Sequence, residues 1–223
     1  MPESIVIVAA RRTPIGGFQG IFSPVSATQL GSFAAAAALA DSGLSPDAID
    51  EVIFGCVLPA GLGQAPARQA AVGAGIAMSV PATTVNKMCG SGMKAVMLAA
   101  DQIRAGSARA ILAGGLESMT NAPYLMLKAR AGYRMGHAEI YDHMFYDGLQ
   151  SPWDGKAMGC FADVTAAKYG FSRAEQDAYA AESVRRAQRA SKEGDFVAEI
   201  APVTIKSRKA SRSSRPTRHS SGR

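Results

Sequence analysis

The chain has 223 residues, 48% of them apolar, which is enough for one large or two small domains around a hydrophobic core. Seven positive side chains and no acid lie in residues 206–223, so subtracting these seven from the net charge of +6 leaves residues 1–205 at −1. The folded body is therefore not basic, which argues against a nucleic-acid-binding domain. Three cysteines at no metal-binding spacing argue against a disulfide framework and for a reducing compartment.

Two further features bear on localisation. The longest apolar run, residues 33–40, is far too short to cross a bilayer. The N-terminus combines Glu3 with a strand pattern, where a signal or transit peptide would have a basic or Arg/Ser-rich segment without acids. We expect a cytoplasmic protein with no membrane partner.

The first 115 residues alternate between predicted strands and predicted helices. Short apolar runs predict strands at residues 5–9, 52–57, 82–85 and 110–113. Helical periodicity predicts helices at residues 28–40, 68–75 and 92–103, and Ser45-Pro46-Asp47 predicts a further helix start. This alternation predicts an α/β core with helices on both faces of a mixed sheet.

Cys89 lies in a short polar stretch between the predicted strand 82–85 and the next helix. A sulfur in the first turn of a helix feels the positive end of the helix dipole and unpaired backbone amides, both of which favour the reactive thiolate. Gly90 and Gly92 leave space for a substrate to approach. The same position also suits a small buried structural cysteine, and the local pattern alone does not separate these interpretations.

The second part of the chain differs from the first in its pattern of predicted elements. Residues 118–156 are loop-rich, helices are predicted at 157–169 and 172–192, and a strand is predicted at 199–206. The second helix begins with a capping box, Ser172-x-x-Glu175, and ends at Gly194. Residues 207–223 contain no large apolar side chain, so we expect a disordered basic tail.

Three sequence motifs, in order along the chain, resemble those of the thiolase family. They are VIVAARRTPIG at residues 6–16, NKMCGSGMKA at residues 86–95 and GGLESMTNAPY at residues 114–124. The resemblance implies a thiolase N-terminal βαβ core over residues 1–117 and a partial coenzyme A-covering loop domain over residues 118–206. It also implies that the C-terminal thiolase domain is absent.

The resemblance implies acyl transfer between coenzyme A thioesters through an acyl group carried on Cys89. Acyl-CoA and acetyl-CoA would be substrates, with no permanently bound cofactor or metal, and the full-length form would be a homo-oligomer, a dimer or a tetramer. Leu149 and Met158 match family positions that contact coenzyme A, although both would also suit ordinary loop packing. Ala157 replaces a His that is usual in acetoacetyl-forming thiolases, which favours a broader 3-ketoacyl-CoA thiolase.

In the family, the catalytic His, a second Cys and an Asn come from the C-terminal domain, so we expect this chain to be inactive alone. We interpret His137 and His143 as structural or coenzyme-adjacent, and Cys56 and Cys160 as core residues. One codon choice, shifted by one base near Lys209, would continue a thiolase strand, so we expect the tail to be frame-shifted. The alternatives are a non-catalytic fragment or partner-binding subunit of a thiolase, and a basic-tailed nucleic-acid binder.

Overall fold

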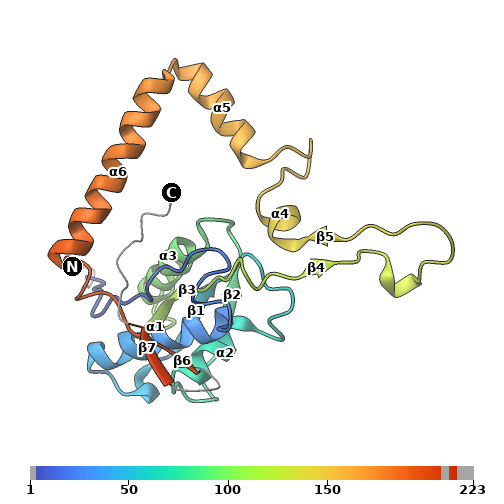
Figure 1. Ribbon diagram of the computed structural model, residues 1–223. Coiled ribbons are helices and arrows are strands. Elements are labelled where there is room, and N and C mark those ends of the chain that lie inside the picture. Colours follow the sequence, from blue (N-terminus) through green and yellow to red (C-terminus); the bar gives the residue numbers. More distant parts are fainter. Residues whose placement is uncertain (1–3, 207–210, 215–223) are drawn as a thin grey trace.

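The computed structural model describes residues 4–206 and 211–214 (Figure 1). Its centre is a three-stranded sheet in the order β2-β1-β3, with both strand pairs parallel. The strands are β1 (Glu51–Gly55), β2 (Ala82–Val85) and β3 (Ile111–Gly115). The predicted α/β core is present. Its three described strands are parallel because helical crossovers return the chain to the same edge of the sheet before each new strand.

Helices cover both faces of this sheet, as the sequence predicted. Val52 and Phe54 of β1 belong to a buried cluster with alanines of α1 and α2, whereas Ile53 packs with Ala95 and Ala99 of α3 on the opposite face. Alternating strand side chains therefore serve two separate cores. The helices are α1 (Ala27–Ser42), α2 (Pro66–Gly73) and α3 (Ser91–Arg104).

Cap residues set the ends of the long helices. The predicted capping box of α6 (Arg173–Glu193) is present, with Ser172 and Glu175 bonded reciprocally, and Gly194 ends the helix in the left-handed conformation. A capping box at Ser26 likewise begins α1. The short 3-10 helix η1 (Pro46–Ala48) forms where the Ser-Pro-Asp run predicted a helix start.

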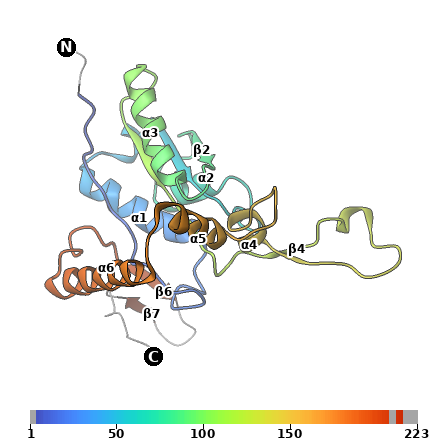
Figure 2. The same ribbon diagram turned by 90° about the horizontal axis from the view of Figure 1, so that it is seen from above.

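The second part of the chain extends away from the sheet. Strands β4 (Tyr124–Leu125) and β5 (Tyr141–Asp142) begin and end a long hairpin extension that protrudes in both views (Figures 1 and 2). Helices α5 (Met158–Tyr169) and α6 contain no buried residue. The remaining elements are η2 (Ala129–Ala131) and α4 (His143–Gly148).

The chain returns to the core through β6 (Val203–Lys206). Val203 is fully buried against Phe22 and Val25, so the late strand packs on the loop before α1. Glu199, just before β6, forms an ion pair with Arg12 at 2.7 Å. These contacts tie the two sequence ends of the described fold together.

Two predictions at the chain ends were wrong. Residues 5–9 form no strand in the described part of the chain, and Val6, Ile7 and Val8 are exposed, because no neighbouring strand supplies a hydrogen-bonding ladder. Within the tail, Ser211–Ser214 forms β7, paired antiparallel with β6, because main-chain hydrogen bonds need no apolar side chain. The rest of the expected disordered tail lies outside the described residues.

A close backbone contact fixes α3 on the sheet. A Cβ on Gly55, the last residue of β1, would lie 2.4 Å from the carbonyl carbon of Ser91 and 2.6 Å from the nitrogen of Gly92. Gly115 at the end of β3 also lies against the helix start, because its Cβ would lie 3.4 Å from the Cα of Gly92. The first turn of α3 therefore sits directly on the carboxyl ends of two strands.

We predict that Gly55→Ala lowers the free energy of unfolding by about 1–3 kcal/mol, because the new methyl group overlaps backbone atoms that cannot rotate away. Gly92→Ala is the matched control at the same junction, since its Cβ would meet its nearest neighbour at an ordinary 3.7 Å. Urea denaturation followed by circular dichroism measures both. Equal stability of Gly55→Ala and the unchanged chain would contradict this account of the junction.

Candidate active site

Cys89 lies in a tight turn that connects β2 to α3. Ser91 Oγ donates to the carbonyl of Met88 at 2.6 Å and accepts from the N–H of Lys87 at 2.9 Å. Asn86 Oδ1 accepts from the N–H of Met88 at 2.9 Å. Met88 has a φ of 50°, in the left-handed region that a non-glycine residue rarely adopts. Side-chain hydrogen bonds on both sides thus hold a strained turn that presents Cys89.

The sequence placed Cys89 inside the first turn of a helix, and this detail was wrong. Helix α3 begins at Ser91 with Gly90 as its N-cap, so Cys89 directly precedes the cap. The left-handed Met88 and the Ser91 hydrogen bonds delay the start of the helix by closing a separate turn. Cys89 nevertheless lies beside the helix end that carries the positive dipole.

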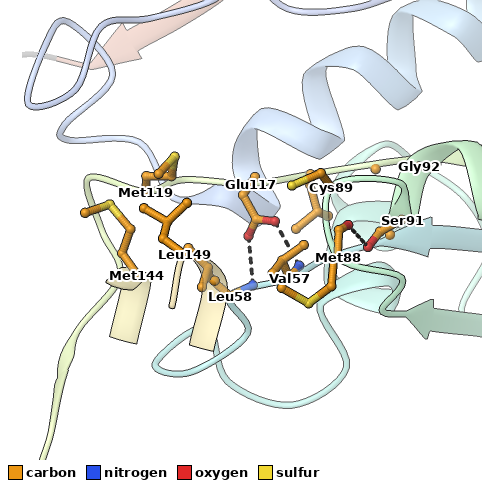
Figure 3. Close-up of a pocket in the computed structure, with 14 residues that line it drawn as sticks. Val57, Leu58, Met88, Cys89, Ser91, Gly92, Glu117, Met119, Met144 and Leu149 are labelled. Atoms are coloured by element: carbon orange, nitrogen blue, oxygen red, sulfur yellow. Dashed lines mark hydrogen bonds between the residues drawn. The ribbon is translucent and has the colours of Figure 1, made fainter. Parts of the chain in front are cut away.

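An apolar cavity of about 420 Å³ opens beside Cys89 (Figure 3). It forms where the carboxyl ends of β1 and β3 meet the start of α3, the usual ligand-binding edge of a parallel sheet. The thiol-bearing residue is exposed, so an entering molecule can reach it. The larger apolar side chains that line the cavity are those of Val57, Leu58, Met88, Leu116, Met119, Met144 and Leu149.

Glu117 supplies the carboxylate in the wall of this cavity. Its oxygens accept hydrogen bonds from the backbone N–H groups of Val57 at 2.8 Å and Leu58 at 3.0 Å. Figure 3 shows Glu117 between Cys89 on one side and Leu149 on the other. Sequence reasoning used the motif that contains Glu117 but missed this role. The available signal was an acidic residue two positions after a strand, where the loops that bind ligands gather.

The two residues expected to contact coenzyme A occupy different positions. Leu149 follows α4 and lines the cavity with Cys89. Met158 is not among the residues that line the cavity, and its side chain is partly exposed. The backbone N–H of Met158 donates to the carbonyl of Leu149 at 3.0 Å, which fixes the start of α5 next to α4.

His143 has a structural place in the fold. Its side chain is 4% exposed, its Nδ1 lies 2.6 Å from Asp147 Oδ2, and its Nε2 accepts from the N–H of Ala60 at 3.3 Å. Because Nε2 accepts, Nδ1 holds the proton and donates it to Asp147. Both ring nitrogens therefore have hydrogen-bond partners within the fold. Neither His143 nor the exposed His137 lines the cavity.

The other two cysteines differ from each other. Cys56 is buried, as predicted, and burial together with the nearby Glu117 carboxylate raises the pKa of its thiol to about 12. Cys160 is exposed in the first turn of α5, so the prediction of core packing was wrong, because α5 buries none of its residues. A helix start therefore does not distinguish Cys89 from Cys160, but the cavity does.

Two features, a membrane-spanning helix and a cluster of metal ligands, are absent from the described residues. No helix among them combines the length and apolar composition that crossing a bilayer demands. Within the same ranges, no three His, Cys, Asp or Glu residues gather closely enough to hold a metal ion.

Comparison with known proteins gives a consistent result. A family model described as "Thiolase, N-terminal domain" matches residues 5–218. The chain is 49% identical over 204 residues to acetyl-CoA acetyltransferase 2 of Arabidopsis thaliana, and 49% identical over 207 residues to an acetyl-CoA acetyltransferase of Pseudomonas aeruginosa. It is 47% identical to a probable acetyl-CoA acyltransferase of Staphylococcus aureus. These matches cover 92–93% of this chain but only 51–53% of the relatives, so the chain spans about half their length.

We predict that iodoacetamide labels Cys89 and Cys160 well before Cys56 at mildly alkaline pH. A pKa of about 12 leaves Cys56 with roughly a thousandfold less thiolate than an ordinary cysteine, and its sulfur is also buried. Brief labelling followed by peptide mass mapping measures the order. Modification of Cys56 at the same rate as the two exposed thiols would contradict the burial found here.

Proposed function

Because this chain belongs to the thiolase family through its match to the N-terminal domain, we propose that Cys89 accepts an acyl group from a coenzyme A thioester. The observation that carries the proposal is the exposed Cys89 at the wall of an apolar cavity, beside the start of α3. The names of the relatives support acyl-CoA as the donor, since they are acetyl-CoA acetyltransferases and a probable acyltransferase.

The transfer converts a cysteine thiol and an acyl-CoA into an acyl-cysteine thioester and free coenzyme A. The Cys89 thiolate attacks the thioester carbonyl carbon, the carbon–sulfur bond to coenzyme A breaks, and the departing thiolate takes up the proton that Cys89 lost. The positive end of the α3 dipole favours both the thiolate and the negative oxygen of the tetrahedral intermediate. The apolar lining of the cavity suits the acyl chain or the pantetheine arm.

Leu149 is the better placed of the two expected coenzyme A contacts, and we propose it as part of the donor site because it lines the cavity with Cys89. We propose that Met158 contributes through its partly exposed side chain at the start of α5, as the family resemblance implies. Ala157, the N-cap of α5, supports a range of acyl chains over strict acetoacetyl specificity. Residues 118–206 would then form the cover over the bound coenzyme A.

The large exposed apolar surface supports assembly with other polypeptides. Met93 and Met97 of α3 are 73% and 53% exposed, and the apolar side chains of residues 6–8 are 61–78% exposed. Surface of this kind on a folded chain favours association. We propose that the active form is an oligomer in which other chain segments cover these residues.

We predict that incubation with acetyl-CoA adds the mass of one acetyl group to the chain, at Cys89. Intact-mass and peptide mass spectrometry locate the adduct, and release of coenzyme A thiol gives the rate. Cys89→Ser should remove the adduct, whereas the matched control Cys160→Ser should retain it, because Cys160 does not line the cavity. Acetylation of Cys160 in preference to Cys89 would contradict the assignment.

We also predict that the 223-residue chain alone does not cleave 3-ketoacyl-CoA by thiolysis. Breaking that carbon–carbon bond needs a base and an acid at the reacting carbon, and no histidine of the described residues lines the cavity. The loss of the magnesium enolate absorbance of acetoacetyl-CoA measures the reaction. Mass spectrometry must show that the sample contains no contaminating full-length thiolase. Turnover at an ordinary enzymatic rate in such a sample would contradict this view and give His137 or His143 a catalytic role.

A further inference from the structure

We propose that Glu117 is a positioning residue for Cys89, which it holds in place through the backbone of Val57 and the side chain of Asn86. The inference deepens the proposed function and rests on it for the role of Cys89. It starts from a continuous line of hydrogen bonds that runs from Glu117 to the residue before Cys89 and passes between three separate segments of the chain. Figure 3 shows the first of these links, from Glu117 to the backbone of Val57 and Leu58.

The first link fixes the segment that follows β1. Glu117 accepts from the N–H groups of Val57 and Leu58, and the thiol of Cys56 donates to the same carboxylate across 3.7 Å. Hydrogen bonds to a charged acceptor are stronger and more directional than neutral ones. Residues 56–58 are therefore held next to the end of β3, because Glu117 is the second residue after that strand.

The second link joins that segment to the turn that contains Cys89. Asn86 Nδ2 donates to the carbonyl of Val57 at 3.4 Å, and Asn86 Oδ1 accepts from the N–H of Met88 at 2.9 Å. One amide side chain thus bridges the segment held by Glu117 and the residue before Cys89. The peptide N–H of Cys56 adds a parallel tie by donating to the carbonyl of Val85 at 3.0 Å.

The turn needs this support because Met88 is a non-glycine residue in the left-handed region. Ser91 holds the turn from the helix side, and Asn86 holds it from the strand side. If the Asn86 side loosens, the turn can relax and move Cys89 relative to the cavity and to the start of α3. Small displacements of a nucleophile reduce the rate of group transfer strongly.

The structure contains a matched carboxylate far from Cys89 along the strands. Asp50, just before β1, also accepts two backbone N–H groups, from Arg109 at 2.6 Å and Ala110 at 3.0 Å, and these bonds lower the pKa of its carboxyl. Asp50 lies at the amino end of the sheet, whereas Glu117 lies at the carboxyl end. Comparing a variant of Glu117 with a variant of Asp50 therefore separates a specific effect on the Cys89 turn from a general loss of stability.

The decisive experiment is amide hydrogen exchange, read by mass spectrometry, on the full chain and its variants. Glu117→Gln replaces one acceptor oxygen by an NH₂ group, so one of the two backbone N–H groups loses its partner. We expect exchange to quicken about tenfold both at residues 56–58 and at residues 86–90, the change that loss of one such bond produces. Asp50→Asn should quicken exchange near residue 110 and leave residues 86–90 unchanged.

A second variant tests the same path from its other end. Asn86→Ala should quicken exchange at residues 86–90, and the double variant with Glu117→Gln should add little at that turn, because both changes break one line of contacts. Additive effects of the two substitutions would overturn the proposal. So would unchanged exchange at residues 86–90 in Glu117→Gln, and Asn86→Ala decides the case if Glu117→Gln does not fold.

A chemical measurement connects the turn to reactivity. The ratio of the acetylation rate of Cys89 by acetyl-CoA to its alkylation rate by iodoacetamide should fall about tenfold or more in Glu117→Gln and Asn86→Ala, because only the bulky donor needs the fixed geometry. Asp50→Asn should leave the ratio unchanged, and an unchanged ratio in the first two variants would overturn the proposal. If the unmodified chain is not acetylated at all, the proposed function fails, while hydrogen exchange still decides the role of Glu117.

Discussion

The close approach of backbone to backbone at Gly55, Gly92 and Gly115 is the constraint on which the candidate site depends. At this junction the first turn of α3 sits directly on the carboxyl ends of β1 and β3, at distances that leave no space for a side chain on Gly55. Two effects follow from it. The turn before α3 is brought to the edge of the sheet, and the loops after β1 and β3 are brought around it. Cys89 and Glu117 meet at one cavity for this reason, although they belong to different loops.

The polar side chains in and around the cavity have separate roles. Glu117 and Asn86 use their hydrogen bonds on backbone groups, and His143 uses both ring nitrogens on Asp147 and Ala60. Cys56 remains a buried thiol because its burial, together with the Glu117 charge, raises its pKa and so opposes ionisation. Cys89 is the exposed thiol at this cavity, so it is the group that an entering thioester meets.

The described fold is also unusually open for a chain with this much apolar surface. Helices α5 and α6 bury none of their residues, the β4–β5 hairpin extends away from the sheet, and α3 leaves one face in solvent (Figures 1 and 2). The chain spans about half the length of the relatives that it matches. The uncovered apolar side chains support the proposal that other chain segments pack on this part of the protein.

The sequence by itself determined the alternation of strands and helices, the capped ends of α1 and α6, and the position of Cys89 between β2 and α3, because these follow from short-range periodicity and cap chemistry. It also identified the family, because the motifs around Cys89 and Glu117 are local strings. Tertiary structure decided what depends on long-range neighbours. Three features depend on whether a distant segment packs nearby. They are the missing strand at residues 5–9, the surface position of Cys160 and the bond from Val57 to Glu117. The sequence near a residue does not show which distant segment will pack against it, so only the folded chain reveals that Glu117 lies at the same cavity as Cys89.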